Sequence, residues 1–172
     1  MKSTPNVLSE IEGKYQEMID LLGKYNAAKE PKDKEDIIGE VSVRLNSLEG
    51  IEEKIVYPAV QSNLGDNECL VESQERHSKV RLLLTQLSRL VADQDKSSYE
   101  NVVKDLQCAV TGLFDQEKCL FKEIEKSDID LQVLTREAEL EAGAVMKMLS
   151  QTSCKTGFGV SADFAQLSKI CT

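Results

Sequence analysis

The sequence predicts an all-α protein, an up-down-up-down antiparallel four-helix bundle followed by an additional C-terminal helix and a short tail helix. Apolar residues recur every three or four positions through four long segments, which is the pattern of amphipathic helices. Short polar stretches separate these segments, as in antiparallel bundles. The 172 residues include only three prolines, and turn signals are too few for a β-sandwich.

The first predicted helix runs from Pro5 to about Asn26. Thr4 supplies a capping hydroxyl, and Pro5 occupies the first helical position. The polar stretch 29–33 ends the helix. Its apolar and aromatic residues share one face: Val7, Leu8, Ile11, Tyr15, Met18, Ile19, Leu22 and Tyr25.

The second predicted helix begins near Asp33, has Pro58 near its end and stops before Gly65. Its inward positions are Ile37, Val41, Leu45, Leu48, Glu52, Ile55 and Ala59. The third helix is expected from Asn67 to Asp93. Its inward positions are Leu70, Gln74, His77, Val80 or Arg81, Leu84, Leu87 and Val91.

The fourth predicted helix follows the polar loop 93–98 and ends near Lys126, which completes a bundle domain over residues 5–126. Its inward positions are Tyr99, Val102, Val103, Leu106, Val110, Leu113, Glu117, Leu120 and Ile124.

Residues 127–172 form a predicted C-terminal helical extension. Ser127 and Asp128 are expected to cap a fifth helix that reaches Leu149, and the segment 161–163 to cap a last short helix. Residues on one stripe of the fifth helix are Leu131, Leu134, Ala138, Val145 and Met148. We interpret these elements as packing elements, or as the surface for a protein partner or for a homodimer.

Charge and composition exclude several classes of protein. The net charge of −9 and a pI near 4.8 argue against nonspecific binding of nucleic acid or anionic membranes. No stretch has the roughly 18–20 uncharged apolar residues of a membrane span, and charged residues stand where a signal peptide needs an apolar run. A cytoplasmic location is therefore expected.

The five cysteines show no CxxC spacing and are expected to be reduced thiols rather than a disulfide framework or a zinc site. Cys108 and Cys119 are three helical turns apart and are expected to be small buried thiols. The chain has no phosphate-binding glycine loop, catalytic triad or HExxH motif, so enzymatic activity is not expected.

Four polar residues, one in each bundle helix, occupy positions where the period demands an apolar one: Tyr15, Glu52, His77 and Glu117. A carboxylate that is buried alone is costly, so two of them near one another imply a cation, a proton or a hydrogen-bonding partner. His77 and Tyr15 are the candidates for that partner.

Three segments resemble the hemerythrin-like (HHE cation-binding) family over roughly Val7 to Lys126. The run 48–58 (LEGIEEKIVYP) is similar to a family motif of His-x-x-x-Glu-Glu, an apolar pair, an aromatic residue and proline. The segment around His77 resembles the third-helix histidine segment, and 113–121 the second His-x-x-x-Glu copy. The resemblance implies a four-helix bundle whose core holds a di-iron centre that carries dioxygen or senses oxygen, iron or redox state.

When the family pattern is aligned with this chain residue by residue, Glu52, His77 and Glu117 match its ligand positions, and most of its histidine ligands are replaced. The first-helix histidine falls at Tyr15, or at Lys14 if the register slips by one. The other two histidines of the motifs fall at Leu48 and Leu113, which ligate nothing; the residues one turn either side of His77 are Ser73 and Arg81. An alternative register of the fourth helix uses Gly112 and Gln116, and the apolar stripe favours Leu113 and Glu117.

One imidazole, two carboxylates and a phenol cannot assemble the conventional di-iron site. Three hypotheses remain for Tyr15, Glu52, His77 and Glu117: a metal-free structural network, a site for one iron or other divalent ion, or solvated groups if the helix phases are wrong by one residue. The leading functional interpretation is a degenerate hemerythrin-like module with a binding, sensory or structural role and no cofactor. The alternatives are a metal or oxygen sensing or storage protein and a helical protein-interaction module.

Overall fold

The computed structural model describes residues 6–156. Within this range the chain is helical and contains no strand, which confirms the all-α class. No helix in this part of the chain is both long enough and apolar enough to cross a membrane. In chain order the elements are α1 (Val7–Tyr25), α2 (Pro31–Ile51), the π-helical turn η1 (Glu52–Val56), α3 (Tyr57–Leu64), α4 (Glu68–Leu87), α5 (Lys96–Glu125) and α6 (Leu131–Thr156).

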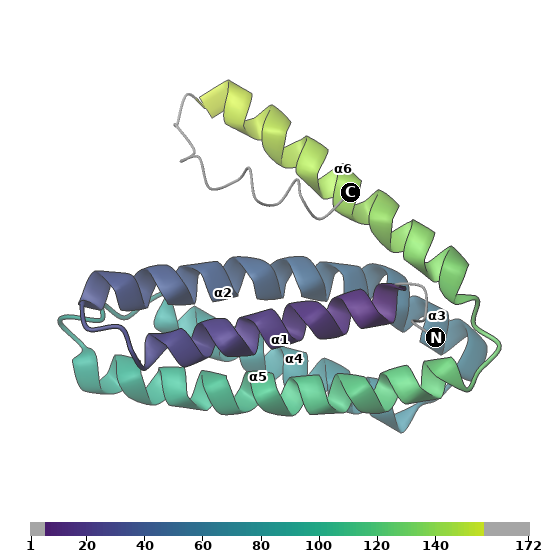
Figure 1. Cartoon of the computed structure of the whole chain (residues 1–172), viewed down its shortest axis with the longest axis horizontal. Helices are drawn as coiled ribbons and strands as arrows, with labels where there is room; N and C mark the ends of the chain where they lie inside the picture. Colours follow the sequence, from purple (N-terminus) through teal and green to yellow (C-terminus); the bar gives the residue numbers. More distant parts are fainter. Residues whose placement is uncertain (1–5, 157–172) are drawn as a thin grey trace.

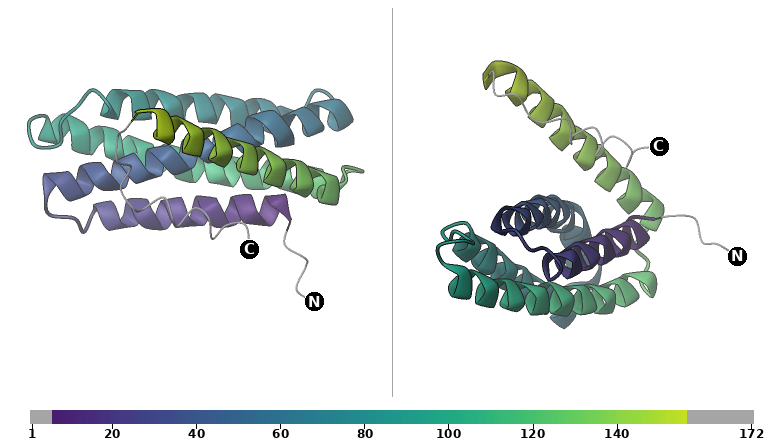
Figure 2. Two further views of the ribbon diagram at one scale, coloured as in Figure 1. Left: turned by 90° about the horizontal axis from the view of Figure 1, so that it is seen from above. Right: turned by 60° about the vertical axis from the view of Figure 1, so that its left-hand side comes forward.

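Four long helical segments, α1, α2, α4 and α5, lie side by side, and α3 continues α2 beyond the π turn (Figure 1). α4 packs chiefly along α5, and α1 packs against both α2 and α5. The apolar faces of these helices form one continuous core. α6 leaves this group of helices at an angle, which both views of Figure 2 show.

α1 begins at Val7 behind a reciprocal capping box. The side chain of Asn6 accepts a hydrogen bond from the Ser9 N–H, and the Ser9 hydroxyl accepts one from the Asn6 N–H, both at 3.0 Å. The predicted cap at Thr4 and Pro5 lies outside the described residues. The predicted inward residues of this helix are buried, apart from the half-buried Ile19.

The predicted second helix contains an irregularity that shifts its phase. The Tyr57 N–H donates to the Glu52 carbonyl, five residues back, so η1 contains one residue more than an α-helical turn. Beyond it, Val56 and Val60 occupy the core, and the predictions of Ile55 and Ala59 there were wrong by one position. Near the start of α2, Ile38 is buried and Ile37 only half-buried.

Pro58 does not end the second helix. Proline has no N–H to donate to the carbonyl four residues earlier, and a π turn immediately before it is one way to accommodate that loss. α3 therefore continues to Leu64 and stops at Gly65, whose φ of +67° lies in the region that favours glycine.

α4 begins behind Asn67, whose side chain accepts the Leu70 N–H at 3.0 Å, and ends at Leu87 rather than near Asp93. It packs chiefly on α5. Its buried face differs by one residue from the predicted face at two places, with Ser73 and Leu83 buried instead of Gln74 and Leu84. The predictions of Gln74 and Val91 as inward positions were wrong, since both are exposed, and Leu84 is half-buried against the core. The buried residues of this helix are Leu70, Ser73, His77, Val80, Leu83 and Leu87.

α5 follows the prediction closely, because its apolar stripe is regular over thirty residues. Its predicted inward residues are buried apart from the half-buried Val102, and Phe114 and Phe121 join them. The expectation that Cys108 and Cys119 are buried was wrong, since both thiols are exposed on this helix.

α6 begins at Leu131, not next to Ser127. The Asp130 carboxylate accepts the N–H groups of Gln132 and Val133, so Asp130 provides the cap. The Ser127 hydroxyl instead donates to the last turn of α5. Among the described side chains of the predicted stripe, Leu134 and Ala138 are buried and Leu131 is half-buried; the side chains of Val145 and Met148 and the predicted tail helix lie outside the described residues.

Candidate functional site

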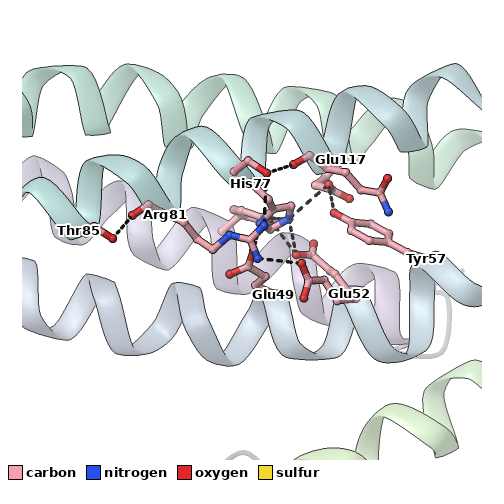
Figure 3. A network of polar contacts seen from close by, with 11 residues as sticks. Glu49, Glu52, Tyr57, His77, Arg81, Thr85 and Glu117 are labelled. Carbon is pink, nitrogen blue, oxygen red and sulfur yellow. Dashed lines mark hydrogen bonds and ion pairs between the residues drawn. The ribbon is translucent and has the colours of Figure 1, made fainter.

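Three of the predicted site residues, Glu52, His77 and Glu117, meet in the interior. They come from η1, α4 and α5, are 0%, 3% and 0% exposed, and offer ligand atoms that all lie within 4.8 Å of one another. Figure 3 shows their side chains pointing toward a common point between the helices. Tyr15 of α1 joins them and is fully buried. The hypothesis that these groups are solvated is therefore wrong.

His77 lies among three carboxylates, with Nε2 facing two of them and Nδ1 facing the third. Its Nε2 is 3.0 Å from Glu52 Oε2 and 3.8 Å from Glu117 Oε1. Its Nδ1 is on the other side of the ring, 3.6 Å from Glu49 Oε1. The imidazole ring therefore lies between Glu49 on one side and the inner carboxylates Glu52 and Glu117 on the other.

Two tyrosines donate hydrogen bonds to the inner carboxylates. The Tyr15 hydroxyl donates to Glu52 Oε2 at 3.2 Å and is 3.5 Å from His77 Nε2. The Tyr57 hydroxyl donates to Glu117 Oε1 at 2.7 Å. One oxygen of each carboxylate is thus satisfied by a phenol.

The second oxygen of each inner carboxylate is buried without a partner. Glu52 Oε1, Glu117 Oε2 and the Ser73 hydroxyl make no hydrogen bond with the described residues. Buried polar atoms are nearly always paired, with protein, water or an ion. A proton, a water molecule or a cation would supply the partner that these atoms lack.

A second layer surrounds His77 on the side toward solvent. Glu49 is almost buried, and its Oε1 is 2.8 Å from the Arg81 guanidinium, which also reaches Glu53 Oε1 at 3.0 Å. The π turn begins at Glu52, three residues after Glu49 in the last turn of α2, and both side chains face inward. Figure 3 shows Arg81 reaching across from α4 to Glu49.

Sequence reasoning missed Glu49 and Tyr57. Glu49 is three residues before Glu52, a spacing that places both side chains on one helical face. That spacing was the available signal for Glu49. Tyr57 comes inward through the shift in phase at η1, which the regular period does not anticipate.

Burial is the largest cause of the pKa shifts in the cluster. Desolvation raises the pKa of Glu52 well above its ordinary value, and it raises that of Glu117 to about 7. Burial lowers the pKa of His77 and raises those of Tyr15 and Tyr57. Near neutral pH the imidazole therefore favours its neutral form, Glu52 favours its protonated form, and Glu117 is close to its midpoint unless a cation replaces the proton.

The remaining positions of the family pattern hold apolar or small residues. Leu48 and Leu113 are fully packed core residues, and Ser73 is the buried residue one turn before His77. Gln116 is only half-buried and donates its amide to the Cys69 carbonyl at 3.1 Å, which favours Glu117 over Gln116 as the inward residue.

No family model, no curated protein and no solved structure matches this chain.

Proposed function

We propose that the chain is a hemerythrin-like up-down-up-down four-helix bundle that binds one divalent cation through Glu52, His77 and Glu117. Its role is that of a binding or sensory module, not an enzyme. The observation that carries the proposal is the orientation of His77, with Nε2 directed toward the two inner carboxylates and Nδ1 toward Glu49.

This orientation is the one that metal-binding histidines adopt. A ligating imidazole uses one nitrogen for the metal and gives the N–H of the other to a carboxylate or carbonyl, which fixes the ring and its tautomer. Glu49 Oε1 lies 3.6 Å from Nδ1, slightly beyond hydrogen-bond distance and on the side where that second contact is made, and Arg81 holds Glu49 by an ion pair of 2.8 Å. The lowered pKa of His77 leaves its Nε2 lone pair available.

The charge and the unpartnered oxygens also fit one divalent ion. Two carboxylates neutralise its charge, and Glu52 Oε1 and Glu117 Oε2 gain the partner that they otherwise lack. One imidazole with two carboxylates suits iron, manganese or zinc. Tyr15 and Tyr57 would remain hydrogen-bonded to the carboxylates and hold them in place.

The second candidate is a metal-free structural network. It is favoured by the direct 3.0 Å contact of His77 Nε2 with Glu52 and by the raised pKa values of both inner carboxyl groups. In that case Glu52 and Glu117 keep their protons, and function depends on the outer surface of the protein.

Metal-dependent melting separates the two candidates. Chelator-treated protein is melted with and without excess Mn(II), Zn(II) or, anaerobically, Fe(II). Saturation at about 100 times the dissociation constant adds about 2.7 kcal/mol, so the melting temperature should rise by about 5–10 °C with at least one of these ions. Glu52→Gln and His77→Gln should abolish the rise.

Glu125→Gln is the matched control, because Glu125 is an exposed carboxylate on α5, the helix that also carries Glu117. It should retain the metal-induced rise. Circular dichroism confirms that each variant is folded. A rise that persists in Glu52→Gln and His77→Gln, or no rise in the wild type with any of the three ions, would contradict the cation site.

The cytoplasmic location and the protein partner or homodimer contact through residues 127–172 remain predictions from the sequence.

A further inference from the structure

Two cysteines from different helices meet at the surface between α4 and α5. Cys69 lies in the first turn of α4 and Cys119 in the C-terminal half of α5, 50 positions apart in the chain. Their sulfur atoms are 2.7 Å apart, and one thiol donates a hydrogen bond to the other. Cys119 is exposed and Cys69 is half-buried.

The surrounding contacts hold this pair in register. Gln116, one turn before Cys119, donates its amide to the Cys69 carbonyl at 3.1 Å. α4 and α5 also form the most extensive helix pair of the described chain. The two thiols are therefore kept together by the fold.

We propose that Cys69 and Cys119 are a redox pair that closes a reversible disulfide between α4 and α5. A disulfide requires a sulfur–sulfur distance of about 2.05 Å, so the two sulfur atoms need to approach by only about 0.7 Å. Side-chain rotation of one cysteine supplies a displacement of this size without moving a helix. The disulfide does not depend on the proposed cation site.

The oxidant is hydrogen peroxide, which the two thiols reduce in two steps. Hydrogen peroxide transfers one oxygen to the sulfur of Cys119, the more exposed thiol, giving a sulfenic acid and one water molecule. The Cys69 sulfur then attacks the Cys119 sulfur and displaces a second water molecule. Two thiols are oxidised to one disulfide, and one peroxide is reduced to two molecules of water.

The surroundings of the two thiols agree with Cys119 reacting first with the peroxide. Burial and the hydrogen bond to Cys119 raise the pKa of the Cys69 thiol to about 11. Cys69 is also half-buried whereas Cys119 is exposed, so an oxidant in solution reaches Cys119 first, and Cys69 reacts with the partner that it already contacts. This assigns Cys119 as the attacked thiol and Cys69 as the resolving thiol.

The disulfide would connect the two helices that carry His77 and Glu117. Ser73 follows Cys69 by one helical turn, and Glu117 precedes Cys119 by two residues. Oxidation therefore fixes the separation of α4 and α5 next to the buried cluster. It also closes a long loop of chain, which restricts the unfolded state and raises the melting temperature.

The test is a disulfide map of the full-length, chelator-treated protein after brief treatment with one equivalent of hydrogen peroxide. Trypsin places Cys69 in peptide 55–76, Cys119 in peptide 119–122 and Cys108 in peptide 105–118. We expect non-reducing mass spectrometry to find 55–76 joined to 119–122 within one chain. We also expect a rise in melting temperature of about 5–10 °C, which dithiothreitol reverses.

Cys108→Ser is the matched control, because Cys108 is exposed on the same helix α5, and it should retain the linked peptides. Cys69→Ser and Cys119→Ser should lose them. The map of the wild type does not depend on how well the variants fold. The proposal is overturned if the oxidised wild type lacks this link, or if Cys119 is joined mainly to another chain or to another cysteine.

Discussion

Replacing Glu117 by glutamine is expected to stabilise the metal-free protein above pH 7 and to leave its stability almost unchanged at pH 5. Glu117 is fully buried, and burial raises its pKa from 4.5 to about 7. The folded protein therefore retains a proton that the unfolded chain loses between these two pH values. Because the folded state then binds more protons than the unfolded state, the free energy of unfolding falls as the pH rises through this window.

The size of the effect follows from the two pKa values. One pKa unit corresponds to about 1.4 kcal/mol, so the interval between 4.5 and about 7 amounts to about 3 kcal/mol above pH 7. Glutamine does not ionise, and its carbonyl oxygen can still accept the hydrogen bond that Tyr57 donates at 2.7 Å. In a chain of this length the gain corresponds to about 6–12 °C in melting temperature.

The assay is urea denaturation of chelator-treated wild type and Glu117→Gln at pH 5 and pH 8. Only the difference between the two proteins is interpreted, since His77 and Glu52 titrate in both. Asp115→Asn replaces an exposed carboxylate on the same helix and should follow the wild type. Equal stability of wild type and Glu117→Gln at both pH values would show that Glu117 does not titrate as a buried group. A divalent ion at about 1,000 times its dissociation constant adds about 4 kcal/mol to the wild type, which exceeds the gain from glutamine, so it should reverse the order at pH 8 because only the wild type binds it.

Three further predictions concern the same bundle. Replacing both Leu48 and Leu113 by histidine should lower the melting temperature of the metal-free protein, because two polar groups enter a packed core. Anaerobic Fe(II) should then raise the melting temperature of this variant. No rise with Fe(II) would argue against the alignment with the hemerythrin-like pattern. Tyr57→Phe removes the hydrogen bond that lowers the pKa of Glu117, so the fall in stability, which begins near the unfolded pKa of 4.5, should continue to higher pH than in the wild type; a fall that ends at the same pH in both proteins would contradict this. Asn6→Ala removes the cap of α1 and should lower the free energy of unfolding by about 1 kcal/mol in urea denaturation, whereas an unchanged value would show that the first turn is held by other contacts.

The regular parts of the fold could be predicted from the sequence. α1 and α5 have clear apolar stripes, and almost every inward residue on them was identified, including Tyr15 and Glu117. The phase beyond Glu52 could not be predicted, because the extra residue of η1 shifts the face that points inward. This is why Val56 and Val60 replace Ile55 and Ala59 in the core.

The predicted site residues do meet, but part of the site depends on contacts that periodicity does not encode. Polar residues on apolar stripes identified Glu52 and His77 because a stripe position must be buried. The partners that orient them depend on how far each helix is displaced along its axis. Contacts between Arg81 and Glu49, or between Cys69 and Cys119, require that alignment, which only the assembled helices provide.

The metal content of the untagged protein tests the central claim most directly. The protein is purified anaerobically, incubated with Fe(II), Mn(II) or Zn(II), dialysed and analysed for metal per chain; a polyhistidine tag has to be removed because it supplies ligands of its own. We predict close to one ion per chain for the wild type with at least one of these metals, and close to none for His77→Gln. Near zero metal in the wild type under all three conditions would contradict the cation site and favour the metal-free network of Tyr15, Glu52, His77 and Glu117.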